Sequence, residues 1–155
     1  MDLSFPAHDD PRRVEVRQFL AEHHPLAPEQ LAAAGYVQPR WPQPWGRDAD
    51  AETALVIDQE LRAAGVDAHG HNPIGIGWAG PTILAAGTDD QRDRFLGPIL
   101  DGSEFWCQLF SEPGSGSDLA SLSTSAVRDG DTYVLNGQKV WNTYAEKSDW
   151  GILLA

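Results

Sequence analysis

Two turn-forming dipeptides, Asp129-Gly130 and Asn136-Gly137, constrain the fold of the last third of this chain more than any other feature. Both dipeptides favour type I′ turns, because the two central residues of such a turn need a positive φ. They separate three segments of strand-like composition, which cover residues 122–128, 132–135 and 138–141. The pattern therefore predicts an antiparallel β-meander in this part of the chain.

Helical patterns dominate the chain before about residue 103. Val16, Phe19 and Leu20 follow the i, i+3, i+4 spacing of one apolar helix face. Thr88 and Gln91 have the spacing of a capping box, which marks the start of a helix. Helices are expected over residues 11–24, 27–34, 50–64, 81–86 and 89–96.

The switch from helical to strand-like composition predicts one domain boundary. Gly97-Pro98 is expected to break the last helix, because proline has no backbone N–H and restricts the residue before it. We therefore expect an α+β fold, with an α-helical domain over residues 1–103 and a β-domain over residues 104–155. Residues 151–155 form a bare apolar strand with no turn or cap after it. Because such an edge is rarely left at a natural terminus, the chain is expected to be truncated.

The acidic composition argues against one class of partner. The chain has 11 Lys and Arg against 23 Asp and Glu, a net charge of −12, which repels nucleic-acid phosphates. The first eleven residues lack the apolar core of a signal peptide, and no apolar run approaches the ~20 residues of a membrane span. We expect a cytoplasmic protein without membrane insertion. Cys107 is expected to be a small buried hydrophobe, with a redox thiol as the alternative, although no base is adjacent to it.

The histidines give a weak signal for a metal site. His23-His24 stands at a helix end, where His also caps carbonyl groups. His69 and His71 stand in a Gly-rich segment with only Asp67 nearby. Because no Cys/His framework accompanies them, zinc is not expected.

The small-residue loop over residues 111–118 permits several interpretations. Gly114-x-Gly116 resembles the start of a dinucleotide fingerprint, but Leu119 stands where a third Gly is needed, and a strand follows where a helix is needed. A nucleophile elbow is not matched either, because Gly114 and Gly116 flank Ser115 directly. On the residues alone, a flexible connector remains the plain alternative.

A longer string contains this loop. It covers residues 108–143, QLFSEPGSGSDLASLSTSAVRDGDTYVLNGQKVWNT, and continues in Ala145 and Asp149-Trp150. This string resembles the acyl-CoA dehydrogenase family. The preceding part matches more loosely, through Trp41-Pro42-x-x-Trp45-Gly46 and Asn72-Pro73-Ile74-Gly75. The resemblance implies an N-terminal helical domain followed by the first strands of an antiparallel β-barrel-like middle domain.

The resemblance also implies a chemistry. In this family FAD lies against the middle domain, and the acyl-CoA thioester lies between the flavin and a carboxylate base. The base removes the α-proton, and the β-hydrogen leaves as hydride to flavin N5. The implied partners are an acyl-CoA substrate, an electron-transferring flavoprotein as electron acceptor, and further subunits of a homo- or hetero-oligomer.

Site residues follow from the resemblance position by position. Ser111 stands where many family members have Thr, and both residues offer a hydroxyl group. Asn142 differs from the apolar residue that is common at its position. Ser117 matches a residue that contacts the acyl-CoA chain. Turn capping and core packing are the alternative roles. The implied cofactor-binding residues are Gln108, Phe110, Ser111, Trp141, Asn142 and Thr143.

No catalytic residue is expected within the chain. In the family the base is a Glu of a C-terminal helical domain that this sequence does not include. Glu112 is expected to fix the geometry of its loop, and Asp118 is not a candidate base. The 155-residue piece alone is therefore expected to be inactive. Oxidases and monooxygenases of the same fold, and a non-catalytic partner subunit, remain alternatives.

Overall fold

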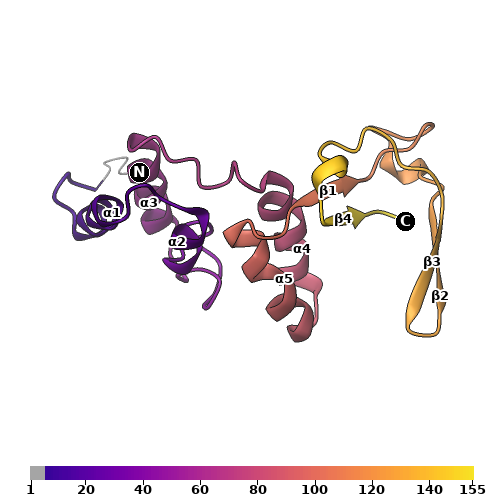
Figure 1. Cartoon of the computed structure of the whole chain (residues 1–155), viewed down its shortest axis with the longest axis horizontal. Helices are drawn as coiled ribbons and strands as arrows, with labels where there is room; N and C mark the ends of the chain where they lie inside the picture. Colours follow the sequence, from indigo (N-terminus) through magenta and orange to yellow (C-terminus); the bar gives the residue numbers. More distant parts are fainter. Residues whose placement is uncertain (1–5) are drawn as a thin grey trace, which may run out of the picture.

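The computed structural model describes residues 6–155, and it separates a helical region from a smaller region of strands (Figure 1). The predicted α+β class is confirmed. A π-helical turn over Gly75–Ala79 precedes α4. The helices and strands are α1 (Pro11–Glu22), α2 (Pro28–Ala33), α3 (Ala51–Ala63), α4 (Gly80–Ala86), α5 (Asp89–Asp101), β1 (Trp106–Leu109), β2 (Ser125–Asp129), β3 (Thr132–Asn136) and β4 (Trp150–Leu153).

Side-chain caps fix the starts of the longer helices. Asp10 accepts a hydrogen bond from the backbone N–H of Arg12 at the start of α1, and Asp50 accepts one from Thr53 at the start of α3. At α5 the predicted capping box forms in both directions, with distances of 3.2 Å from Gln91 N to Thr88 Oγ1 and 2.9 Å from Thr88 N to Gln91 Oε1. These bonds satisfy N–H groups that the first helical turn leaves without partners.

The predicted break of α5 at Gly97-Pro98 is wrong, because the helix continues to Asp101. Proline removes one helical hydrogen bond, but the clash with the preceding residue is small when that residue is Gly. The continued helix buries Leu96, Ile99 and Leu100 almost completely, at 0%, 0% and 2% exposure. Burial of these side chains offsets the lost bond, and the helix ends only at Gly102, whose φ of 77° is left-handed.

The core belongs mainly to the helical region. Trp41 anchors the proline-rich segment after α2, and its ring lies directly against Gly80 at the start of α4. A Cβ at Gly80 would come within 2.5 Å of Trp41 Cη2, so only glycine permits this packing. The buried apolar cluster comprises Val16, Leu31, Tyr36, Val37, Trp41, Ile57, Leu61, Ile76, Ala79, Leu96, Ile99, Leu100 and Trp106.

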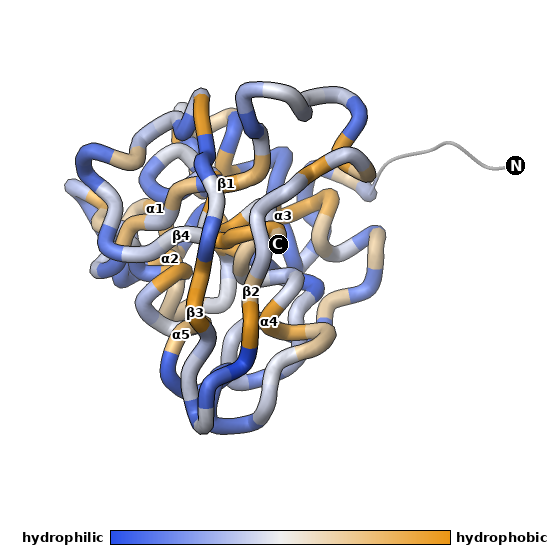
Figure 2. Tube along the Cα trace, turned by 90° about the vertical axis from the view of Figure 1, so that its right-hand side faces the viewer, coloured by the Kyte–Doolittle hydropathy of each residue, from blue (hydrophilic) through white to orange (hydrophobic). Residues whose placement is uncertain are grey.

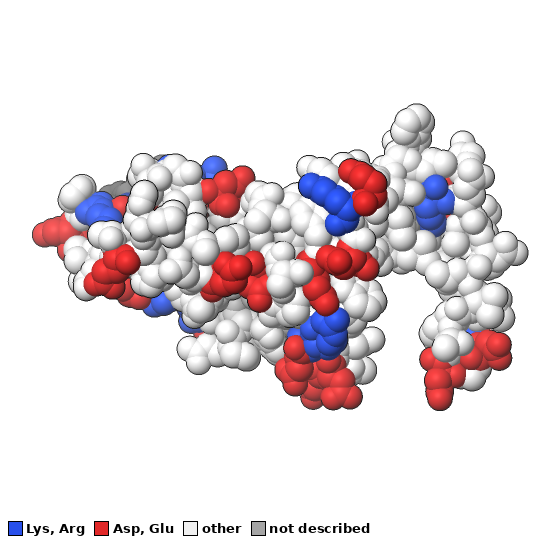
Figure 3. Space-filling view, in the orientation of Figure 1, with Lys and Arg blue, Asp and Glu red and all other residues white. Residues whose placement is uncertain are grey.

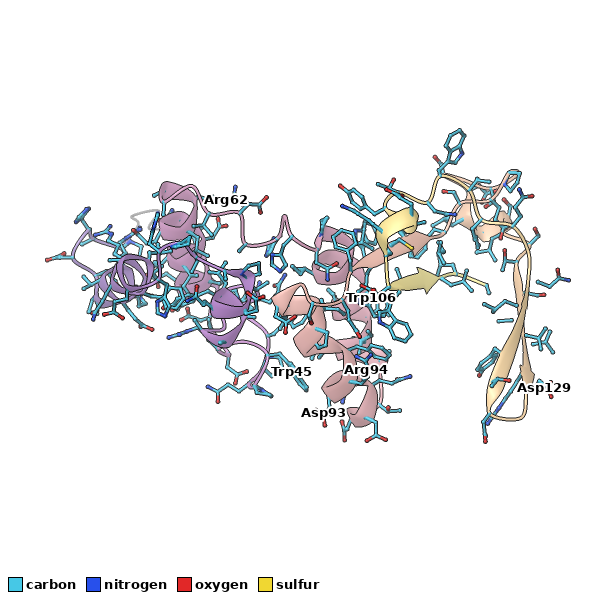
Figure 4. All side chains as sticks on the ribbon, viewed as in Figure 1. Trp45, Arg62, Asp93, Arg94, Trp106 and Asp129 are labelled. Atoms are coloured by element: carbon cyan, nitrogen blue, oxygen red, sulfur yellow. The ribbon has the colours of Figure 1, made fainter. Side chains whose placement is uncertain are left out.

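An aromatic cluster joins α5 to the first sheet. Trp106 of β1 stacks on Trp150 of β4 with a centroid distance of 6.1 Å, and Phe95 of α5 meets both rings edge-on. The guanidinium of Arg94 lies over the Trp150 ring, 5.6 Å from its centroid. Figure 4 shows Arg94 and Trp106 at this junction. The helical region and the first sheet therefore share one packed boundary.

The strands form two separate two-stranded sheets in the described residues. β1 and β4 pair in parallel, with Trp106 opposite Trp150, whereas β2 and β3 form an antiparallel hairpin. The predicted three-stranded meander is wrong, because residues 138–141 are not a strand in the structure. Instead, Val140 donates its N–H to the carbonyl of Ser111, which leads this segment towards the end of β1.

The predicted type I′ turn at Asp129-Gly130 is also wrong. Asp129 pairs with Thr132, so the two loop residues of the hairpin are Gly130 and Asp131. Gly130 has a φ of 62°, and Asp131 is not among the residues of positive φ. A positive φ at the first loop residue alone is the geometry of a type II′ turn, which needs Gly at that position.

The β2–β3 hairpin extends away from the helical region (Figure 1). The residues of both strands are exposed. Val127, Tyr133, Val134 and Leu135 are each more than half exposed. Figure 2 shows apolar stretches along both strands. The hairpin therefore contributes little to the buried core.

Charged side chains are spread over the surface. Acidic groups gather near the start of α5, with Asp89, Asp90 and Asp93, and at the tip of the hairpin, with Asp129 and Asp131 (Figure 3). Among the described residues, no helix is both long and apolar enough to cross a lipid bilayer.

Candidate functional site

A pocket of about 280 Å³ opens where the end of β1 meets the segment that follows β3. Five of the residues predicted to contact a cofactor line it, namely Gln108, Phe110, Ser111, Trp141 and Thr143. Ile74 and Val140 complete its wall. The structure thus brings together the two runs that the sequence analysis singled out, although the β2–β3 hairpin separates them in the chain.

Backbone contacts hold the two runs together. β1 fixes Gln108 in register with Ile152 of β4. Just beyond β1, the carbonyl of Ser111 accepts the N–H of Val140 at 2.9 Å. The carbonyl of Phe110 accepts a hydrogen bond from Lys139 Nζ at 3.0 Å. Two hydrogen bonds therefore join the two walls of the pocket, one from Lys139 to Phe110 and one from Val140 to Ser111.

Trp141 has an unusual conformation for a large apolar residue. Its φ is 58°, in the left-handed region that residues with a Cβ rarely occupy, and its side chain is 88% exposed. The Trp141 carbonyl accepts the N–H of Thr143 at 2.9 Å, which makes the segment turn sharply. An exposed indole on a strained backbone is typical of a binding surface.

Ile74 was missed as a site residue by sequence reasoning. It belongs to the segment Asn72-Pro73-Ile74-Gly75, which was noted only as a loose family match. The side chain of Asn72 is fully buried, and it ties this segment to α5 and β1 by hydrogen bonds. Its partners are the carbonyls of Ile99 and Glu104 and the N–H groups of Gly75 and Trp106.

Two of the predicted site residues do not line the pocket. Asn142 points its Nδ2 back to the carbonyl of Lys139 at 3.3 Å, and its Oδ1 is buried without a partner in the described residues. Ser117 is exposed in the loop after β1. In that loop Ser115 Oγ donates to the carbonyl of Asp118 at 2.6 Å.

Glu112 fixes the loop geometry, as expected from the sequence. Its carboxylate is buried and accepts hydrogen bonds from the N–H groups of Ser123 and Thr124 and from Lys139 Nζ, at 2.7, 2.9 and 2.8 Å. The Lys139 ammonium is the main reason why the pKa of Glu112 lies well below its usual value. A carboxylate held ionised in this way is a poor proton acceptor.

Three of the histidines lie at hydrogen-bond distance from backbone carbonyl groups. A ring nitrogen of His23 lies 2.8 Å from the Phe19 carbonyl, and those of His69 and His71 lie 2.9 Å from the carbonyls of Val37 and Leu100. Within residues 6–155, no group of His, Cys, Asp and Glu side chains is placed to hold a metal ion. Cys107 is buried and free.

Comparison with known proteins identifies both regions of the chain. The family model for the acyl-CoA dehydrogenase N-terminal domain matches residues 11–103, and that for the acyl-CoA dehydrogenase middle domain matches residues 107–155.

Individual relatives agree. Acyl-CoA dehydrogenase FadE34 of Mycobacterium tuberculosis is 48% identical over 148 residues, which cover 92% of this chain and 20% of that protein. Acyl-CoA dehydrogenase IpdE1 of the same organism is 44% identical over 129 residues, or 82% of this chain and 33% of that protein.

A solved structure extends the agreement to the fold. The crystal structure of the ChsE4-ChsE5 complex from Mycobacterium tuberculosis matches with a TM-score of 0.71 and 32% identity, covering 99% of this chain and 43% of that one. The chain thus spans a minor part of the length of the relatives it matches. On the strength of the two matched domains, the chain belongs to the acyl-CoA dehydrogenase family of oxidoreductases.

Proposed function

We propose that this protein acts in the FAD-dependent α,β-dehydrogenation of an acyl-CoA thioester, and that the pocket at the end of β1 receives the flavin ring. The observation that carries the proposal is the convergence of Gln108, Phe110 and Ser111 with Trp141 and Thr143 around one cavity.

The chemistry of the pocket fits a flavin ring system. Ile74, Phe110 and Val140 supply apolar walls for a flat aromatic ring, while Ser111 and Thr143 supply hydroxyl donors for its polar edge. The cavity of about 280 Å³ suits the ring system rather than a whole dinucleotide, so the adenosine part extends beyond it. When bound, FAD supplies the hydride acceptor.

The residues of this chain bind and orient the ring. The hydroxyl groups of Ser111 and Thr143 donate hydrogen bonds to an edge that becomes more negative on reduction, which favours the reduced state. Trp141 lines the cavity, and its indole, which is 88% exposed, is free to pack against the bound ring. Ser117, on the loop beside the pocket, contacts the acyl-CoA chain in this proposal.

The general base comes from outside these residues. None of the side chains that line the pocket is a carboxylate. Glu112 lies close by, but its carboxylate is already committed to Lys139, Ser123 and Thr124. We therefore assign α-proton abstraction to a Glu of a C-terminal helical domain, as in longer members of the family, and expect the 155-residue chain alone to be inactive.

A heteromeric assembly completes the proposal. The matched ChsE4-ChsE5 structure is a complex of two proteins, which supports the same kind of assembly here. We propose an electron-transferring flavoprotein as electron acceptor and a cytoplasmic location. A non-catalytic subunit that supplies half of a flavin site is the second candidate function, favoured by the lack of a carboxylate in the pocket.

Titration with FAD tests the proposal. The purified protein should shift the visible absorption bands of FAD, and the Ser111→Ala/Thr143→Ala variant should weaken this effect. Ser103→Ala serves as the matched control, because Ser103 is exposed and lies outside the pocket. Anaerobic addition of acyl-CoA thioesters to a longer chain that includes the C-terminal helical domain then separates the candidates, since a non-catalytic subunit binds FAD without its reduction. Unchanged FAD spectra with the wild-type chain would contradict both.

A further inference from the structure

The ion pair between Lys139 and Glu112 is the most enclosed one in the part of the chain that the structure describes. The two side chains are 8% and 4% exposed, and Lys139 Nζ lies 2.8 Å from Glu112 Oε1. The next most enclosed pair, Arg13 with Glu60 in the helical region, is 10% and 8% exposed. Burial of two charges costs solvation free energy, so such pairs often serve conformational specificity more than stability.

The Lys139 ammonium has a second partner in the wall of the pocket. It donates to the carbonyl of Phe110 at 3.0 Å as well as to Glu112. Val140, the next residue, donates its N–H to Ser111 at 2.9 Å. Lys139 therefore lies behind the pocket, at the point where its two walls are joined, without lining the cavity itself.

Glu112 fixes a third segment to the same point. Its Oε2 accepts the N–H and hydroxyl of Ser123 at 2.7 and 2.8 Å, and its Oε1 accepts the N–H of Thr124 as well as Lys139. Gly137, at the end of β3, packs so closely on Thr124 that any Cβ there would overlap its hydroxyl. These contacts place the segment that follows β3 beside the pocket.

We propose that the Lys139–Glu112 pair is a positioning device, which sets the Trp141–Thr143 wall of the pocket against the Phe110–Ser111 wall. The inference rests on the proposed function, because it assigns these walls to the flavin ring. Both residues act through others, since neither lines the cavity. Lys139 acts through the Phe110 carbonyl and the backbone of Val140, whereas Glu112 acts by holding Lys139.

Two measurements on the full chain test this role. Amide hydrogen exchange without flavin reports on the wall directly, and fluorescence titration with FAD reports on its use. In Lys139→Met, exchange at residues 139–144 should accelerate and FAD affinity should fall about tenfold, as expected for the loss of one buried hydrogen bond. Lys139→Gln can still donate to Phe110 and should keep part of the affinity.

A double variant separates positioning from simple charge compensation. Glu112→Gln/Lys139→Met removes both charges, so global stability should recover relative to Lys139→Met. The Phe110 carbonyl still lacks its donor, so exchange at residues 139–144 should stay fast and FAD affinity low. Glu60→Gln, which breaks the buried pair of the helical region, is the matched control and should change neither readout.

Opposite results would overturn the inference. If the double variant regained slow exchange and wild-type FAD affinity, the pair would be merely structural. If Lys139→Met folded with unchanged exchange at residues 139–144, the pair would not position the wall. If wild-type protein failed to bind FAD while Lys139→Met showed fast local exchange, the proposed function would fail, but the positioning of the two walls by this pair would stand.

Discussion

A cluster of apolar side chains is buried in the helical region, whereas the apolar side chains of the β2–β3 hairpin are largely exposed. Leu96 and Ile99 of α5 are completely buried, whereas Val127 and Val134, which face each other across the hairpin, are 63% and 55% exposed. The helical region therefore has its own core, while the hairpin depends on its turn and its ladder of hydrogen bonds. The candidate site lies between the helical region and the hairpin. There the buried ion pair of Glu112 and Lys139, rather than a large apolar core, holds the segments together.

The largest expected effect is on the free energy of unfolding. If substitutions in the helical core and in the hairpin lowered it equally, the contrast between the two regions would be wrong. Leu96→Ala should lower the free energy of unfolding by about 2–5 kcal/mol, because it leaves a cavity in the helical core. Val134→Ala, the matched change in the hairpin, should cost less than about 1 kcal/mol. Urea unfolding of both variants measures the difference, and equal losses would refute this division.

Loss of the two hydroxyl groups of the pocket should have the next largest effect. Ser111→Ala and Thr143→Ala each remove a donor to the reduced flavin edge, worth about 1.5–3 kcal/mol for a charged acceptor. Oxidised flavin carries less charge than reduced flavin. The free-energy change calculated from the shift in reduction potential should therefore be larger than that calculated from the loss of affinity for oxidised FAD. Spectroelectrochemical titration and a binding titration give the two values. Equal changes in both would count against the assigned role.

Gly75→Ala tests how the helical region supports the site. The new Cβ would lie 2.5–2.7 Å from side-chain atoms of Asn72, which is buried and held by four hydrogen bonds. Such overpacking should cost about 1–3 kcal/mol and disturb Ile74 beside it. Gly77→Ala meets no atom within 4 Å and is the control. In thermal unfolding, Gly75→Ala should have a lower midpoint temperature than Gly77→Ala. A lower midpoint for Gly77→Ala would contradict the packing of Gly75 against Asn72.

The smallest effect concerns the response of the helical region to alkaline pH. Burial, reinforced by the nearby Glu15 carboxylate, raises the pKa of Tyr36 from 10.0 to about 12. The neutral phenol is favoured in the folded state, so its contribution to stability is complete below pH 10 and declines as pH rises from 10 to 12. Unfolding free energies across this range should decline less in Tyr36→Phe. An identical decline in both proteins would contradict the assignment.

Sequence patterns predicted the elements whose signals are local. The capping box of Thr88 and Gln91 acts within one helical turn, so the start of α5 was found. The continuation of α5 through Pro98 was not found, because it depends on burial of Ile99 and Leu100 against other helices. Local rules cannot weigh that gain against one lost hydrogen bond.

In the candidate site, too, local sequence signals were found and contacts between distant segments were missed. The resemblance named five residues that line the pocket, because they lie in two recognisable runs. It missed Ile74, which reaches the pocket only because the Asn72 side chain binds backbone groups of Ile99, Glu104 and Trp106. The parallel pairing of β1 with β4 escaped prediction for a similar reason, since the two strands are far apart in the chain.

Chemical-shift mapping of FAD binding tests the central claim most directly. In a titration of isotope-labelled protein, the largest amide shifts should occur at residues 108–111, 140–143 and Ile74, which surround the pocket. The hairpin residues 125–136 and the helices α1 and α3 should shift little. A shift pattern centred elsewhere, or the absence of shifts at saturating FAD, would contradict the assignment of this pocket to the flavin ring.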